Sequence, residues 1–162
     1  MVSPIVNAKI KVGDEIKGFL GKTNSGEKID ISNYRGKVTI ISFWASWCPP
    51  CMQELPVLSG IQKKVGVESI QVIAVNLKES KKLFKGVSEA LVDYDLILTH
   101  DKSGRISKRF GLKAIPFMLI VGADGRVIAK HVGYNESKLP TLVAEINQAV
   151  RDAKINNARP KN

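Results

Sequence analysis

The chain has 162 residues, of which 44% are hydrophobic and 25% charged, and its formal net charge at pH 7 is +10. This length suits a single domain over residues 1–162, with about 1–15 and 154–162 loosely ordered, and its apolar runs are too short to span a bilayer. The basic residues are not interleaved with base-stacking aromatic residues, which argues against a nucleic-acid partner and indicates a solvated surface, or one that faces a membrane or steers partners.

The first half of the chain predicts a hairpin, a buried strand and a helix. A turn signal divides the hairpin over residues 18–31. The β-branched and aromatic run at residues 38–44 predicts a strand buried on both faces. A helix is expected from about Pro49, with a kink at Pro56. The apolar face of this helix consists of Leu55, Leu58 and Ile61.

The second half continues the alternation of strands and helices. We expect a strand at 70–75, a helix at 79–93, a strand at 96–98, a short helix ending near Gly111, strands at 117–121 and 127–131, and a helix from Leu139. The apolar stripe of the helix at 79–93 consists of Leu83, Val87 and Leu91, widened by Phe84 and Val92. This order predicts an α/β fold in which helices cover both faces of a mixed sheet.

The two cysteines, Cys48 and Cys51, are three positions apart at the junction between the strand at 38–44 and the helix. A disulfide scaffold needs more cysteines at wider spacings, so this pair is expected to serve chemistry. Unpaired N–H groups at a helix N-terminus favour a thiolate, which predicts Cys48 as the attacking thiol and Cys51 as the resolving thiol. Pro49 and Pro50 remove two N–H donors, and this favours a moderate or reducing couple over a strong oxidant.

Metal or haem binding by this cysteine pair is disfavoured. His100 and His131 have no ligand-like spacing to the pair, so a four-ligand zinc site is not expected. Covalent haem attachment would need a histidine directly after Cys51, where the chain has Met52. We therefore expect no metal and no cofactor besides the redox-active disulfide itself.

The run at residues 44–51, Trp-Ala-Ser-Trp-Cys-Pro-Pro-Cys, is followed by Glu54 and Pro56 and resembles the TlpA/ResA-like branch of the thioredoxin superfamily. The resemblance extends over nearly the whole chain, through the N-terminal hairpin and through Ile115 and Pro116 before the strand that follows them. It implies a thioredoxin fold, with a central mixed β-sheet, helices on both faces and an added N-terminal β-hairpin.

The resemblance also implies roles for individual residues. Pro116 would be cis and face the disulfide, with the backbone of Ile115 available to pair with an extended substrate. Phe117 stands where the family usually has threonine, which would change the substrate groove. The implied substrate-binding set is Trp47, Pro49, Pro50, Ile115, Pro116 and Phe117.

A proton acceptor for Cys51 is the remaining part of the predicted site. Ser42 occupies the position of the buried aspartate of cytoplasmic thioredoxin, so that acceptor is missing. Glu79 falls where the resemblance places an active-site glutamate and becomes the candidate, with a solvated charge in the first turn of a helix as the alternative. Glu54 is expected to have a surface or helix-pairing role.

The function implied by the resemblance is thiol-disulfide exchange on protein substrates through Cys48 and Cys51. A reductase outside the cytoplasm is favoured, with cytochrome c maturation as a candidate role, an upstream dithiol donor in the membrane and a monomeric state. A disulfide isomerase or oxidase is an alternative within the same class. The rival class is a thioredoxin-fold adaptor or metal chaperone. No signal or anchor is visible after Met1, so a cytoplasmic location also stays open.

Overall fold

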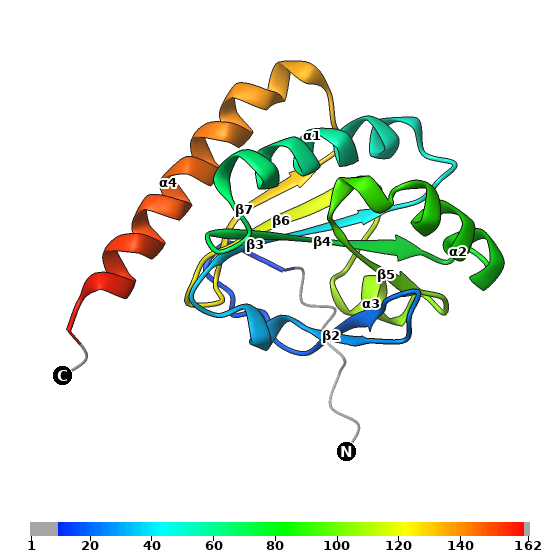
Figure 1. Ribbon diagram of the computed structural model, residues 1–162, viewed down its shortest axis with the longest axis horizontal. Helices are drawn as coiled ribbons and strands as arrows, with labels where there is room; N and C mark the ends of the chain where they lie inside the picture. The colour runs from blue at the N-terminus through cyan, green and yellow to red at the C-terminus, as the bar shows by residue number, and fades with distance from the viewer. Residues whose placement is uncertain (1–9, 161–162) are drawn as a thin grey trace.

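The computed structural model describes residues 10–160, which fold around one seven-stranded mixed sheet with the strand order β2-β1-β5-β4-β3-β6-β7 (Figure 1). Strands β3, β4 and β5 are parallel, whereas β1, β6 and β7 each run antiparallel to their neighbours. The strands are β1 (Phe19–Lys22), β2 (Lys28–Asp30), β3 (Val38–Trp44), β4 (Ile70–Leu77), β5 (Ile97–Asp101), β6 (Phe117–Val121) and β7 (Val127–Val132).

Helices cover both faces of this sheet, which confirms the predicted thioredoxin fold. The α-helices are α1 (Pro49–Val65), α2 (Lys81–Ala90), α3 (Arg105–Arg109) and α4 (Leu139–Ala158). Short 3-10 helices are η1 (Ile31–Tyr34), η2 (Val92–Tyr94) and η3 (Glu136–Lys138). The apolar residues of α1, α2 and α4 pack on one face of the sheet, and those of α3 and η1 pack on the other (Figure 1).

Strand β3 is an interior strand of the sheet and leads the chain to the cysteine pair. All seven of its residues are buried, as the apolar run predicts. Side chains alternate along a strand, so Ile41 and Phe43 face the core below α3, whereas Ile40 and Trp44 face the cores below α1 and α4. The chain leaves β3 at the carboxyl edge of the parallel strands and enters α1 after four residues. Ligand and catalytic groups of α/β folds commonly gather at this edge.

The helix predicted at 79–93 and the strand predicted at 96–98 differ most in extent from the observed elements. The helix predicted at 79–93 is confined to α2, because the Ser80 hydroxyl caps its first turn by accepting from the Leu83 N–H at 3.1 Å. Leu83 is 45% exposed and Val92 is 67% exposed, so the predicted stripe is wrong at both positions. Strand β5 extends to Asp101, beyond the predicted residue 98, because Thr99 donates to the Leu20 carbonyl and so anchors the added residues to β1.

The chain ends are also better ordered than the sequence predicts. Gly13 donates to the carbonyl of Val127, and the Val127 N–H donates to the carbonyl of Asp14, so loose order is wrong for residues 13–15. Helix α4 continues to Ala158 and its Asn157 side chain donates to the Gly36 carbonyl at 2.8 Å, so loose order is wrong for residues 154–158. The predictions for 1–9 and 161–162 lie outside the described residues. Within residues 10–160, no helix has the length and apolar character needed to cross a bilayer.

Gly21 lets the N-terminal hairpin approach β5 closely, and replacing it should be costly. Its φ is +105°, and a Cβ there would lie 3.0 Å from the Thr99 side chain and 3.1 Å from the His100 carbonyl oxygen. We expect Gly21→Ala to lower the free energy of unfolding by about 3 kcal/mol, because strain and a backbone clash combine. Gly26→Ala is the matched control, since Gly26 has φ +89° with nothing within 4 Å, and should cost only about 1 kcal/mol. The measurement is urea unfolding of both variants. Equal losses of unfolding free energy in Gly21→Ala and Gly26→Ala would contradict the close packing of β1 on β5.

Candidate active site

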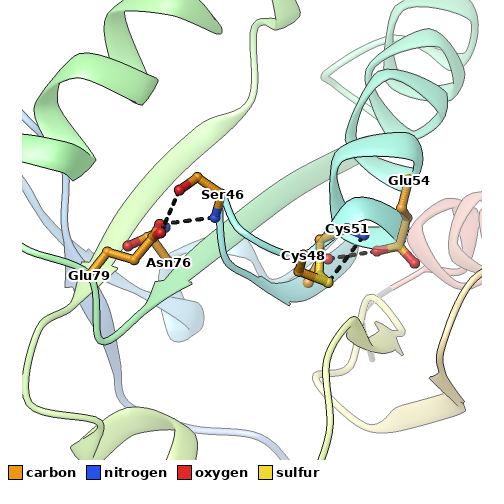
Figure 2. The surroundings of a disulfide bond; sticks show 7 residues. Ser46, Cys48, Cys51, Glu54, Asn76 and Glu79 are labelled. Carbon is orange, nitrogen blue, oxygen red and sulfur yellow. Dashed lines mark hydrogen bonds between the residues drawn. A yellow bond between two sulfur atoms is a disulfide. The ribbon is translucent and has the colours of Figure 1, made fainter.

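The two cysteines form a disulfide at the N-terminus of α1, with their Cα atoms 5.3 Å apart (Figure 2). Cys48 is the N-cap residue, and the Cys51 N–H points at the Cys48 sulfur with a nitrogen-to-sulfur distance of 3.4 Å. Pro49 and Pro50 fill the two positions between them and offer no N–H. The Cys51 N–H is therefore the local backbone donor that can stabilise a Cys48 thiolate once the disulfide is reduced.

Both cysteine residues are buried, and Cys48 is slightly the more exposed of the two, at 4% against 1% for Cys51. Trp47, directly before Cys48, is 68% exposed and offers a large apolar surface beside it. This asymmetry matches the predicted order of attack, in which Cys48 acts first and Cys51 acts from within the fold.

The Ile115–Pro116 peptide bond is cis, as the resemblance implies. Ile115 is partly buried and packs against the apolar cluster that contains both cysteines. Ile115 and Trp47 both line a cavity of about 320 Å³. Lys78 and Lys113 line the same cavity. The Pro116 carbonyl accepts from the Gly133 N–H at 2.8 Å and is thereby used within the fold. Ile115 is the residue of this pair that both packs on the cysteine-containing cluster and lines the cavity.

The side chain of Phe117 does not line a substrate groove, and this corrects the role predicted for it. Phe117 is the first residue of β6 and is 6% exposed. Its ring packs edge-on against Phe43, with ring centroids 6.0 Å apart, in the core on the α3 side of the sheet. Alternation along the strand turns the side chain after Pro116 into the core, so Phe117 contributes packing there.

Glu79 holds the loop that precedes the cysteines. Its carboxylate accepts from the Ser46 N–H at 3.0 Å, from the Ser46 hydroxyl, and from the Asn76 side-chain amide at 2.6 Å. Figure 2 shows Glu79, Asn76 and Ser46 together on one side of this loop, apart from the disulfide. With both oxygens engaged by three donors, Glu79 has the surroundings of a structural carboxylate that fixes the path of the chain into Cys48.

Glu54 is the carboxylic acid beside the buried cysteine, and the expected surface role for it is wrong. It is 2% exposed, and its Oε1 accepts from the Ser42 hydroxyl at 2.8 Å. Burial raises the pKa of Glu54 from 4.5 to about 7, although the Ser42 hydrogen bond and the charge of Lys138 oppose this rise. Glu54 lies three residues after Cys51 on the inward face of α1, near the disulfide in Figure 2.

A signal for Glu54 was present in the sequence. Cys51, Glu54, Leu55 and Leu58 follow the spacing of one helix face, and that face is the predicted buried one. Ser42 stands at the position where cytoplasmic thioredoxin has an aspartate. The carboxyl group of Glu54, on helix α1, accepts a hydrogen bond from this serine. The burial, raised pKa and position of Glu54 make it a second candidate proton acceptor for Cys51, beside the predicted Glu79.

A cysteine pair at a helix N-terminus, a cis-proline and a mixed sheet of this topology define a thioredoxin-fold thiol-disulfide oxidoreductase, an enzyme that works through its own disulfide. The sequence pattern of the Redoxin family matches residues 11–149, and the chain belongs to this family. Within residues 10–160, no group of three or more His, Cys, Asp or Glu side chains could hold a metal ion.

Individual relatives agree with this assignment. The chain is 34% identical to the thioredoxin-like protein YneN of Bacillus subtilis over 126 residues, which cover 76% of this chain and 73% of YneN. It is 29% identical to the thiol-disulfide oxidoreductase ResA of Bacillus thuringiensis, over 77% of this chain and 72% of ResA. Its fold matches the pneumococcal exposed lipoprotein thioredoxin Etrx1 of Streptococcus pneumoniae with a TM-score of 0.67 and 26% identity, over 85% of this chain and 99% of Etrx1.

Proposed function

We propose that this oxidoreductase is a protein-disulfide reductase that works outside the cytoplasm as a monomer. The observation that carries the proposal is the cysteine pair itself: Cys48 at the helix N-cap, Cys51 buried behind it, and two prolines that withhold N–H donors from the thiolate. Limited stabilisation of the thiolate favours a moderate or reducing couple. Similarity to a structure named as an exposed lipoprotein thioredoxin supports the location.

The proposed exchange proceeds in two steps. The Cys48 thiolate attacks one sulfur of the substrate disulfide, a Cys48–substrate bond forms, and the other substrate sulfur leaves as a thiolate. Cys51 then gives its proton to the Glu54 carboxylate and attacks the Cys48 sulfur. The Cys48–Cys51 bond forms, the second substrate sulfur leaves, and two electrons have passed from the enzyme to the substrate. An upstream dithiol donor must then reduce the enzyme again.

The groove beside the disulfide supplies the proposed substrate contacts. Trp47 gives an exposed apolar wall, and Pro49 and Pro50 form the outer surface of the first turn of α1. Pro116 follows Ile115 in a cis peptide bond, and the backbone of Ile115 would pair with an extended substrate segment. Such pairing is independent of substrate sequence, which suits an enzyme that must reach disulfides in different proteins.

Two measurements test the proposed direction of exchange. Equilibration with glutathione should give a reduction potential more negative than about −180 mV, on the side of thioredoxin and away from the strong oxidant DsbA. The enzyme should also reduce the disulfide of a Cys-x-x-Cys-His peptide, the haem-attachment sequence of apocytochrome c, which is a candidate substrate because of the resemblance to ResA-like proteins. A potential near about −120 mV would identify an oxidase and contradict the proposal.

A further inference from the structure

A cavity that includes neither cysteine among its lining residues is strongly cationic. It has a volume of about 870 Å³ and is formed by the β1–β2 hairpin, the start of α2, and the segment from β5 into α3. These elements lie together on one side of the molecule in Figure 1. Five basic side chains line it, and we call it the cationic groove: Lys22, Lys81, Lys102, Arg105 and Arg109.

The protein neutralises the charges of the cationic groove only in part, because the negative charges of Asp30 and Asp101 act on Arg109. None of the ion pairs found among residues 10–160 involves any of its five basic side chains. Asp101 is the acidic residue that borders the groove within the described chain, and it is only 2% exposed. Both oxygens of Asp101 are used in the fold, because they accept from the N–H groups of Ile106 and Ser107 at 3.1 and 2.8 Å. A concave surface of one sign concentrates ligands of opposite charge.

The cationic groove also has an aromatic floor. Phe19 borders it and is 38% exposed, although most phenylalanine side chains are buried. Phe84 stacks on the ring of His100, with centroids 4.7 Å apart and an interplanar angle of 9°, and both residues border the groove. The Arg109 guanidinium is held in place by donation to the Phe19 carbonyl. The groove therefore offers separate basic groups around a firm apolar surface.

His100 connects the cationic groove to the redox site. One of its ring nitrogens lies 2.7 Å from the backbone oxygen of Glu79, within hydrogen-bond distance. The carboxylate of the same Glu79 holds the Ser46 N–H, two residues before Cys48. The groove and the loop before the disulfide are thus linked by hydrogen bonds through His100, Glu79 and Ser46.

We propose that the cationic groove binds an acidic segment of the protein that exchanges disulfides at Cys48, an inference that rests on the proposed function. The basic groups come from β1, from α2, from the segment after β5 and from α3, so they match carboxylates spaced along a chain better than one small anion. The aromatic floor fits apolar side chains between those carboxylates. A flat lipid surface would not reach basic groups that line a hollow.

Peptide binding tests this inference without any turnover. The probe is a fluorescein-labelled peptide of repeated Glu-Glu-Leu units, titrated with the oxidised full chain and followed by fluorescence anisotropy. Lys102→Glu/Arg105→Glu should weaken binding by about tenfold or more, and added salt should weaken binding to the wild type. The matched control is Arg151→Glu/Lys154→Glu on exposed positions of α4, which makes the same change in net charge and should have less than about a twofold effect.

Three outcomes would overturn the inference. Equal losses in the two double variants would mean that the net charge of +10, and not the groove, attracts the peptide. Equal binding of a Gln-Gln-Leu peptide would show that the carboxylates are not recognised. Groove-dependent binding of phosphatidylglycerol vesicles without peptide binding would assign the groove to a membrane. Insulin reduction separates this inference from the proposed function, because an enzyme that reduces insulin but ignores the peptide contradicts only the groove.

Discussion

Replacing Cys48 with serine is expected to abolish dithiol-dependent reduction of insulin, with a loss of about 10³-fold or more. A serine hydroxyl cannot exchange with a disulfide at neutral pH, and no other thiol of the chain is accessible in its place, since Cys51 is 1% exposed and the sequence has two cysteines. The measurement is the rate at which insulin turns turbid in dithiothreitol. Substantial turnover by Cys48→Ser would contradict the assignment of Cys48 as the nucleophile.

Replacing Cys51 gives the complementary result. Cys51→Ser keeps the attacking thiol but cannot resolve the mixed disulfide, so the substrate should stay attached to Cys48 and be identifiable by mass spectrometry. Reduced wild type is the control for folding in both variants. The disulfide closes a short loop and adds only about 2 kcal/mol to the free energy of unfolding. Both serine variants lack it, as the reduced wild type does, so all three should unfold alike. If Cys48→Ser traps the substrate instead, then Cys51 is the attacking thiol and Cys48 is the resolving thiol.

Most of the fold follows from local patterns in the sequence. The run at residues 38–44 coincides with β3 because its β-branched and aromatic residues suit a strand that is buried on both faces. The end of β5 was harder to predict, because Thr99 and Asp101 are polar and yet buried. Their hydrogen bonds go to Leu20 and to the first turn of α3, partners that are distant in sequence or set by the tertiary fold. Such satisfied polar residues cannot be recognised from periodicity.

The sequence predicts the redox chemistry of the site, but it distinguishes the roles of the two glutamates less completely. The cysteine pair and the cis-proline are short motifs with fixed geometry, so sequence was sufficient for them. Glu79 and Glu54 are both glutamates near helix starts, and only burial and partners distinguish them. Glu79 has three hydrogen-bond donors around it, whereas the Ser42 hydroxyl is the donor bonded to Glu54 within the described chain. That difference arises from packing between α1 and the sheet.

The second large effect is expected at Glu54. Glu54→Gln removes the group that accepts the proton of Cys51, so resolution of a mixed disulfide should slow by about 10²-fold. Reduced enzyme mixed with Ellman's reagent separates the two steps, because the first thionitrobenzoate is released by Cys48 and the second by Cys51. Only the second, concentration-independent phase should slow. Glu79→Gln is the matched control, and an equal slowing in that variant would return the proton acceptor to Glu79.

Stability provides an independent readout of the same carboxyl group. The pKa of Glu54 is 4.5 in the unfolded chain and about 7 in the folded one, so the folded state holds the proton more tightly. The contribution of Glu54 to wild-type stability is therefore fully present below about pH 4.5, falls as the pH rises, and levels off above about pH 7. Glutamine has no such titration, so the stability of Glu54→Gln relative to wild type should improve by about 3 kcal/mol across that range.

These two readouts together distinguish a proton acceptor from a merely structural residue. A packing defect in Glu54→Gln would lower stability by the same amount at every pH and would disturb both phases of the Ellman reaction. A proton acceptor predicts a variant that is relatively more stable at high pH and yet slower in one step only. Urea unfolding at several pH values, with Glu79→Gln alongside, gives the first readout. A pH-independent difference between Glu54→Gln and wild type would show that burial does not raise the pKa of Glu54, and the proposed proton transfer from Cys51 would then fail.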